Sequence, residues 1–241
     1  MILVLAGSGE GRELCRLLAA SGVKAIASLA GVTKDPARLA IETISGGFGG
    51  DEGFRRFLRT REITAVVDAT HPFAARITDR TARICKEENV ALLQILRPAW
   101  TSGEGDDWVM IDDEADAALH IPEGAHVFIG TGRGTLHRFE NLPGRILTCR
   151  QIDAPEGPFP FANGQYLIGR PPFSVEDEYA LFSRLKIDWL VVKNAGGVPS
   201  RTKLDAARQL GIRVAMVRRP ARPDTAMVET AAAALDWVVE Q

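Results

Sequence analysis

Short apolar runs alternate along the first hundred residues with longer stretches in which apolar side chains recur at helical spacing. We predict strands at residues 1–6, 24–30, 40–45, 63–70 and 91–98, and helices at 10–22, 51–62 and 73–89. Runs this short and apolar are typical of strands buried on both faces. The alternation therefore predicts a βα repeat built on a parallel sheet.

The same pattern resumes after a polar stretch at residues 101–107. We predict later strands at 126–134, 145–151, 188–197 and 212–220, and a final helix at 224–240. Residues 63–98 and 187–220 both run strand, polar turn, helix and strand, and both end in Arg-Pro. This weak internal repeat indicates that the two halves of the chain share one architecture.

The repeat predicts an α/β fold of two Rossmann-like, doubly wound lobes with parallel sheets, and ligands in the cleft between them. We place the first lobe at residues 1–99 and the second at 100–241. A single sheet with more strands is the alternative.

Composition narrows the class of partner. A net charge of -2 and a pI near 6.1 argue against a general nucleic-acid binder. Cys15, Cys85 and Cys149 lie far apart without zinc-site spacing, so we expect buried thiols and no metal site. The sequence offers no membrane span. We expect a cytoplasmic protein with a small-molecule partner.

The first turn is rich in glycine and lies where a doubly wound fold binds phosphates. "AGSGEG" at residues 6–11 follows the first strand and opens the first helix, so its N–H groups suit a pyrophosphate. The candidate residues are Gly7, Ser8, Gly9, Glu10 and Gly11. A tight turn without a ligand is the alternative.

The end of the second strand bears on the choice between NAD and NADP. An acidic residue there would accept the ribose 2′-hydroxyl and repel a 2′-phosphate. This strand ends in "ASLAGVTK", with Ser28, Thr33 and Lys34 and no acid before Asp35. The pattern favours NADP if a nicotinamide cofactor binds, and an ordinary solvated turn is the alternative.

The third strand is followed by "GGFGG" at residues 46–50. Glycines such as Gly47 and Gly49 let backbone approach a flat ligand, and Phe48 could pack on its ring. A flexible loop with one hydrophobic anchor is the alternative.

Polar and basic side chains collect at other strand ends. Asp68 and His71 in "DATHPFAA" are candidate acid–base groups. Arg97, Arg133 and Lys193 also lie where strands end, which suits a polyanionic substrate. Solvated surface is the alternative for each basic residue, and a structural role is the alternative for His71.

Several of these segments together resemble one enzyme family. "LVLAGSGEGREL", "SLAG", "GGFGG", "VVDATHPFA", "RPAW", "GTGRG" and "VVKNAGG" are similar, in this order, to the precorrin-6A reductases of cobalamin biosynthesis. The resemblance covers nearly the whole chain. It implies a hydride from NADPH to one carbon of the C18–C19 double bond of precorrin-6A and a proton to the other, which gives precorrin-6B.

The resemblance also implies roles for the matched residues. Cofactor binding falls on the first turn and on Ser28, Gly31, Thr33, Lys34, Gly47, Phe48, Gly49 and Thr70. Substrate binding falls on Phe48, His71, Arg97, Trp100, Thr131, Gly132, Arg133, Lys193 and Asn194. The implied substrate is a planar tetrapyrrole rich in carboxylates, and neighbouring enzymes of the corrin pathway are further candidate partners.

Two departures and two alternatives accompany the resemblance. Ala6 and Ser8 replace a glycine and a threonine in the first turn, and Val32 stands where relatives often have arginine. Thr33 and Lys34 are then substitutes for 2′-phosphate binding. The alternatives are reduction of cobalt-precorrin-6A in the anaerobic route and a nucleotide-sensing protein without catalytic activity.

Overall fold

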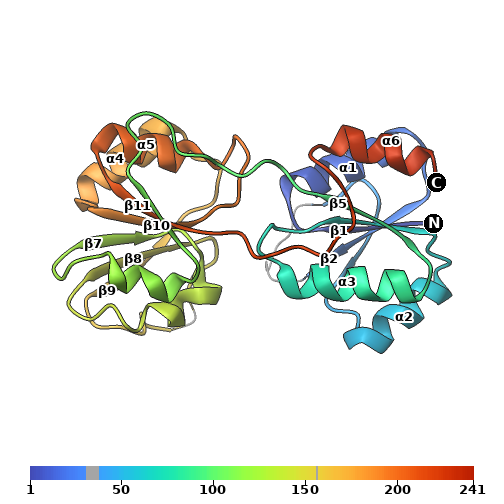
Figure 1. Ribbon diagram of the computed structural model, residues 1–241, viewed down its shortest axis with the longest axis horizontal. Coiled ribbons are helices and arrows are strands. Elements are labelled where there is room, and N and C mark those ends of the chain that lie inside the picture. Colours follow the sequence, from blue (N-terminus) through green and yellow to red (C-terminus); the bar gives the residue numbers. More distant parts are fainter. Residues whose placement is uncertain (31–37, 156) are drawn as a thin grey trace. The chain divides into compact units, whose positions relative to one another are not determined.

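Two six-stranded sheets organise the computed structural model, which describes residues 1–30, 38–155 and 157–241 (Figure 1). All described pairs of neighbouring strands are parallel. Each sheet belongs to its own compact unit of the chain. The predicted α/β fold of two parallel, Rossmann-like lobes is confirmed.

The first lobe contains Met1–Pro98 and Pro220–Gln241. Its strand order is β12-β5-β4-β1-β2-β3. The elements are β1 (Ile2–Ala6), α1 (Gly9–Ala20), β2 (Ala25–Leu29), β3 (Glu42–Ser45), α2 (Gly50–Thr60), β4 (Ala65–Ala69), α3 (Ala75–Glu87), β5 (Ala91–Ile95), β12 (Ala226–Val228) and α6 (Ala231–Val239).

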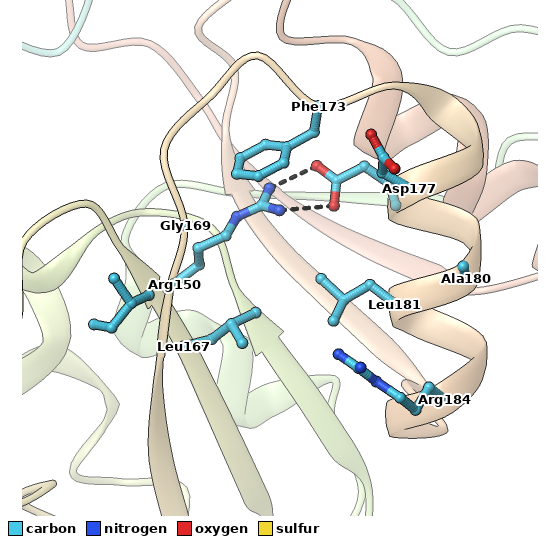
Figure 2. Close-up of a pocket in the computed structure, with 10 residues that line it drawn as sticks. Arg150, Leu167, Gly169, Phe173, Asp177, Ala180, Leu181 and Arg184 are labelled. Atoms are coloured by element: carbon cyan, nitrogen blue, oxygen red, sulfur yellow. Dashed lines mark hydrogen bonds and ion pairs between the residues drawn. The ribbon is translucent and has the colours of Figure 1, made fainter.

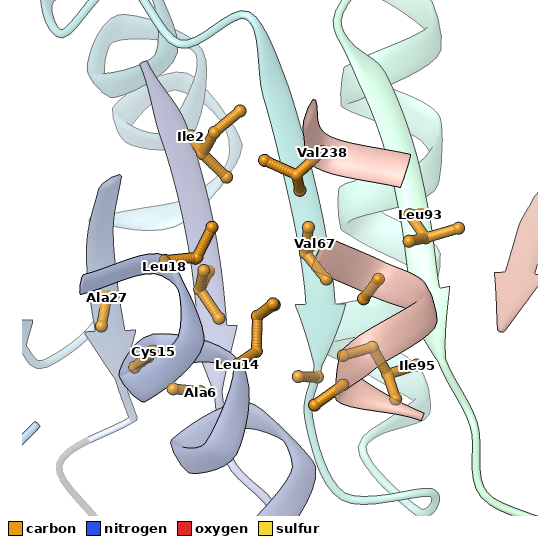
Figure 3. Packing of buried hydrophobic residues seen from close by; sticks show 14 of the residues in the cluster. Ile2, Ala6, Leu14, Cys15, Leu18, Ala27, Val67, Leu93, Ile95 and Val238 are labelled. Atoms are coloured by element: carbon orange, nitrogen blue, oxygen red, sulfur yellow. The ribbon is translucent and has the colours of Figure 1, made fainter. Parts of the chain in front are cut away.

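The central strand β1 is buried along its whole length because helices cover both faces of the sheet. Val4 and Ala6 face a cluster that includes α1 and α6, whereas Leu3 and Leu5 face the cluster of α2 and α3. Figure 3 shows strand side chains meeting Leu14 of α1 and other residues of the first cluster. Burial of each large apolar side chain contributes about 1.5–3 kcal/mol, so β1 anchors both layers.

The second lobe contains Ala99–Arg219. Its strand order is β6-β11-β10-β7-β8-β9. The elements are β6 (Trp108–Ile111), the 3-10 helix η1 (Glu114–Leu119), β7 (His126–Ile129), the 3-10 helix η2 (Arg133–Phe139), β8 (Ile146–Gln151), β9 (Gly164–Ile168), α4 (Val175–Leu185), β10 (Trp189–Lys193), α5 (Thr202–Leu210) and β11 (Arg213–Val217).

The two sheets have the same order, with β7, β8, β9, β10 and β11 in the places of β1, β2, β3, β4 and β5. The sixth position differs in origin. The first lobe fills it with β12, from the end of the chain, whereas the second fills it with β6, which precedes β7. The lobes thus repeat each other except for an exchange of their sixth strands.

This exchange changes the predicted lobe boundaries. Residues 220–241 belong to the first lobe, whereas we had expected the second lobe to extend over residues 100–241. The reason is physical: β12 pairs with β5, and Ala231, Ala234 and Val238 of α6 pack into the same core as α1. The predicted helix at 224–240 is therefore a short strand followed by a helix.

The described part of the chain contains no helix long and apolar enough to cross a membrane. Cys15, Cys85 and Cys149 are buried free thiols, as predicted. Gly31, Thr33 and Lys34, which we had selected for cofactor binding, and the neighbouring Val32 lie outside the described residues.

One glycine of α2 sets how the "GGFGG" loop joins its helix. A Cβ added to Gly53 would lie 1.7 Å from the carbonyl oxygen of Phe48 and 2.8 Å from its carbonyl carbon. No other residue has a side chain small enough for this approach. Gly53 therefore permits the path by which the loop enters α2.

We expect Gly53→Ala to lower the free energy of unfolding by about 2–3 kcal/mol, since the new methyl group must displace loop backbone. Gly134→Ala is the control, because a Cβ there meets no atom within 4 Å. Urea denaturation of both variants measures the difference. Equal stability of the two variants would show that the loop relaxes without cost.

Candidate functional site

The carboxyl ends of β1 and β4 form the switch point of the first sheet. The chain runs from β1 outward to β2 and β3, and then returns to place β4 on the other side of β1. Ligands of doubly wound folds bind outside the strand ends at such a point. Gly7 N–H donates to the Ala69 carbonyl (3.1 Å), and a Cβ on Gly7 would lie 3.2 Å from Thr70 Cα. The two turns therefore lie in direct contact.

The first helix begins at this contact. Ser8 is its N-cap, and its Oγ accepts a hydrogen bond from Gly11 N–H (3.2 Å). A Cβ on Gly11 would lie 3.1 Å from both Ala6 Cα and Ala69 Cβ, so this glycine lets α1 approach the strand ends. The first N–H groups of a helix lack intrahelical acceptors and favour anions. The geometry suits the predicted pyrophosphate site.

Glu10 and Arg97 form an ion pair at the first turn of α1, with Nη1 and Oε2 2.6 Å apart. Burial alone would raise the pKa of Glu10. The hydrogen bond from its own N–H, the charge of Arg97 and hydrogen bonds with Ser8 and Arg97 together hold that pKa below its usual value. We had selected Glu10 for cofactor and Arg97 for substrate, and the structure instead pairs them with each other.

A hollow of about 190 Å³ opens beside the switch point, and we call it the first-lobe hollow. It is lined by Leu5, Ala6, Gly7, Ser28, Ala30, Gly46, Gly47, Phe48, Thr70, Ile77 and Arg80. Its walls come from the ends of β1 to β4 and from α3. The hollow is smaller than sites for drug-sized ligands, so it suits one ring system of a larger molecule.

The structure brings together five residues that we had selected for cofactor binding. Gly7, Ser28, Gly47, Phe48 and Thr70 all line the first-lobe hollow. Sequence reasoning missed Ile77 and Arg80, whose helical positions gave no sign that they face a cavity. Gly9 and Gly49 are not among the lining residues.

Phe48 attaches the glycine-rich loop to α2. Its ring centroid lies 4.8 Å from that of Phe54 and 5.0 Å from that of Phe57. Gly46, Gly49 and Gly50 have φ of 101°, 78° and 85°, which a branched residue rarely adopts. The loop is thus shaped by glycine backbone and held by one half-buried ring that also lines the hollow.

Asp68 is buried, and its side chain stabilises the turn that follows β4. Its carboxylate accepts hydrogen bonds from Thr70 N–H (3.0 Å), Thr70 Oγ1 (2.6 Å) and Thr78 Oγ1 of α3 (2.7 Å). With 2% of its surface exposed, it joins the end of β4 to α3. This setting differs from the acid–base role that we had predicted.

His71 is half-buried at the same turn. Its Nδ1 accepts a hydrogen bond from Phe73 N–H (3.3 Å). This contact favours a neutral ring with its proton on Nε2. Nε2 of His71 then carries the ring proton and can donate a hydrogen bond, whereas Asp68 is buried and engaged in its own turn.

The second lobe repeats the switch-point contact. Gly130 N–H donates to the Val191 carbonyl (2.8 Å), as Gly7 does to Ala69. In the turn that follows, Thr131 Oγ1 accepts from Thr135 Oγ1 (3.1 Å), and Gly132 has a φ of 82°. Arg133 is exposed and has no acidic partner within the described ranges.

Three predicted substrate residues are tied to other groups of the second lobe. Lys193 Nζ lies 3.2 Å from Glu114 Oε1. Asn194 Oδ1 accepts from Trp100 N–H (2.8 Å), and its Nδ2 donates to the Trp100 carbonyl (2.9 Å). Trp100 is itself buried, with Nε1 donating to the Gly197 carbonyl. Trp100 and Asn194 thus fix a loop, which differs from the flat and polar substrate contacts that we had expected.

A larger hollow of about 550 Å³ lies between β9 and α4 (Figure 2). Arg150 and Glu178 line it and form a two-point ion pair, and the ring centroid of Phe173 lies 4.1 Å from the guanidinium centre. None of the residues that we had selected lines this hollow. Arg150 and Glu178 neutralise each other, and Asp177 and Arg184 are the other described charged residues that line the hollow.

A smaller neighbouring hollow contains Lys203 and Gln151. Burial lowers the pKa of Lys203 to about 8, with Glu178 opposing and Arg150 reinforcing the change. Its Nζ donates to the Ser200 carbonyl (2.6 Å). The sequence shows Lys203 only as one of several basic residues at the later turns, for which solvated surface is the alternative.

Comparisons with known proteins agree over almost the full chain. The family model described as "Precorrin-6x reductase CbiJ/CobK" matches residues 1–239. A precorrin-6A reductase of Rhodococcus erythropolis is 42% identical over 98% of this chain and 96% of its own. One from Rhodobacter capsulatus is 36% identical over 99% and 96%. A solved structure titled CobK precorrin-6A reductase has a TM-score of 0.92, with 36% identity over 99% of this chain and 96% of that one.

Relatives named cobalt-precorrin-6A reductase are more distant. They match this chain at 25% to 28% identity. The relatives named precorrin-6A reductase that are described above are thus more similar to this chain, at 36% and 42% identity.

A substitution at Gly47 tests whether the glycine-rich loop leaves room for a ligand in the first-lobe hollow. Gly47 is not among the glycines with positive φ, and a Cβ there meets no atom within 4 Å. We expect Gly47→Val to keep the free energy of unfolding within about 1 kcal/mol, while the side chain fills the hollow and raises the Kd for a nicotinamide dinucleotide about tenfold. Calorimetric titration and urea denaturation measure the two effects.

Gly134→Val is the matched control outside the hollow. Gly49→Val cannot replace this variant, because the φ of 78° at Gly49 would strain any branched residue. Its effect on the Kd could not be separated from its effect on the free energy of unfolding. Unchanged dinucleotide affinity in Gly47→Val would contradict a role for the loop in binding.

Proposed function

The chain belongs to the precorrin-6x reductase family CbiJ/CobK, and we infer from this that it reduces precorrin-6A with a hydride from NADPH. It is an oxidoreductase of cobalamin biosynthesis, and a reductase with Rossmann-like lobes implies a nicotinamide cofactor. The observation that carries the proposal is the full-length match to the family and to a solved structure, together with the hollow at the β1–β4 switch point.

The lining of the first-lobe hollow supports NADPH over NADH. Its described residues include no aspartate or glutamate, and Ser28 stands at the end of β2, where an acid would select the ribose 2′-hydroxyl. We place the adenosine half of the cofactor in this hollow and the pyrophosphate at the start of α1. The N–H groups of Ser8 and Gly9 are then the candidates to hold phosphate, since those of Gly7 and Gly11 already donate to the Ala69 carbonyl and to Ser8 Oγ.

The second lobe supports binding of the tetrapyrrole. Its glycine-rich turn after β7 presents the exposed Arg133 beside Thr131 and Gly132. A guanidinium pairs well with the carboxylates that such a substrate carries. We propose Arg133 as a substrate anchor, whereas Lys193 and Arg97 already contact carboxylates of the protein itself.

The reaction depends more on how the site orients cofactor and substrate than on a strongly acidic side chain. The nicotinamide, when bound, supplies the hydride to one carbon of the C18–C19 double bond, and a proton reaches the other carbon. Negative charge left on the conjugated macrocycle is shared by its nitrogens, so the residues of the site need mainly to orient the two ligands. We propose His71 as the candidate donor, because its half-buried imidazole lies in the turn that follows β4 at the switch point.

Incubation of the protein with precorrin-6A and each nicotinamide cofactor tests the function. We expect one NADPH oxidised for each precorrin-6B formed, with kcat/KM at least tenfold higher for NADPH than for NADH. Absorbance of both chromophores gives the stoichiometry. Cobalt-precorrin-6A is the matched control substrate, and faster turnover of it would reassign the substrate. No oxidation with either substrate would favour a sensing protein.

We expect His71→Ala to lower kcat by less than about 10²-fold, because water or substrate carboxylates can also deliver the proton. His137→Ala, at an exposed position of η2, is the control. Steady-state rates and the Kd for NADPH separate chemistry from binding. A loss of turnover greater than about a hundredfold, with unchanged affinity for NADPH, would instead make His71 the essential acid.

A further inference from the structure

Arg80 of α3 is a half-buried cation in the wall of the first-lobe hollow. The centre of its guanidinium lies 4.9 Å from the ring centroid of Phe54 and 5.7 Å from that of Phe48. These two rings restrict the side chain to one surface of the hollow. Its Nε is buried and has no hydrogen-bond partner.

The charge of Arg80 lacks a nearby counterion. Within the described ranges Arg80 forms no ion pair, and every other described residue that lines the hollow is neutral. Burial lowers its pKa, Asp51 and Asp68 act in the opposite direction, and Arg83 adds to the lowering. Asp51 is paired with Arg83, and Asp68 already accepts three hydrogen bonds. A partly desolvated guanidinium without an ion-pair partner is unfavourable, and a bound anion would relieve this.

We propose that Arg80 forms a phosphate subsite that pairs with the 2′-phosphate of NADPH. This assignment rests on the proposed use of a nicotinamide dinucleotide by the first lobe. The other phosphates have a separate place, because the N–H groups at the start of α1 suit the pyrophosphate. The ends of β2 and β3, with Ser28 and Gly47, line the same hollow as Arg80, and the adenosine ribose binds at the end of the second strand in such folds.

The glycine-rich loop makes this subsite accessible. Gly46 and Gly47 add no side chain to the wall that they share with Arg80, and the Phe48 ring centroid lies 5.7 Å from the guanidinium centre. A planar guanidinium held on aromatic rings loses little freedom when it binds a phosphate. The "GGFGG" loop thus has two effects. Phe48 holds the guanidinium of Arg80 in place for an anion, and the glycines leave room for a ring of the ligand.

The test compares NADP⁺ and NAD⁺ binding by calorimetry without any tetrapyrrole. Arg80→Met keeps a long apolar side chain against the two rings and removes the charge. We expect the Kd for NADP⁺ to rise about tenfold or more and the Kd for NAD⁺ to change less than about twofold, since only NADP⁺ carries the 2′-phosphate. Arg80→Lys, which keeps the charge without the planar fork, should lie between.

Arg76→Met is the matched control, one turn earlier on α3 at an exposed position outside the hollow. It should change neither Kd. The NADP⁺ affinity of the unmodified protein should also fall more steeply with salt than that of Arg80→Met. If Arg80→Met destabilises the fold, Arg80→Lys and the salt dependence decide the question.

Three outcomes would overturn the proposal. Equal losses for both dinucleotides would make Arg80 a support of the loop or of the adenine. Unchanged NADP⁺ affinity would remove it from the site while leaving the proposed function intact. An unmodified protein that binds NAD⁺ as tightly as NADP⁺ would overturn the cofactor proposal as well, and reduction of precorrin-6A with NADH would show that the reductase activity itself stands.

Discussion

The hydrogen bond from Gly7 N–H to the Ala69 carbonyl extends the parallel pairing of β1 and β4 past Ala6, the last residue of β1. Glycine eases this approach, because a Cβ on Gly7 would lie 3.2 Å from Thr70 Cα, which is closer than ordinary van der Waals contact. The contact brings the turn that opens α1 against the turn that leads to α3. The first N–H groups of α1 and the side chain of His71 both take their positions from these two turns. The equivalent bond from Gly130 to Val191 organises the second lobe in the same way.

The fold was largely predictable because its signals are local. Buried strands such as β1 and β10 are continuous apolar runs, and α1 follows a capping serine. The missed strands β6, β9 and β12 are short or lie at sheet edges, where burial leaves a weaker pattern. The exchange of sixth strands had no local signal at all, because it depends on which sheet edge a three-residue strand joins.

Site residues whose role depends on glycine backbone were predictable. Those whose role depends on contacts with distant side chains were less so. Gly7, Gly47 and Phe48 were recognisable because missing side chains at strand ends are visible in a sequence. Glu10 and Arg97 are 87 residues apart, and Trp100 and Asn194 are 94 apart, so nothing local shows that each contacts the other. Arg80 was not predicted either. In the sequence it resembles a solvated arginine, and its contacts with Phe48 and Phe54 are visible only in the structure.

The exchanged strands set the order in which the lobes are finished during protein synthesis. The second lobe has all its strands once β11 has left the ribosome, because β6 comes first. The first lobe is begun earlier but must wait, with β5 as an open edge and the α6 side of its core uncovered, until the second lobe has been translated. An open edge and bare apolar surface favour association with other chains. The part of the chain made first is therefore the part that a nascent polypeptide must protect longest.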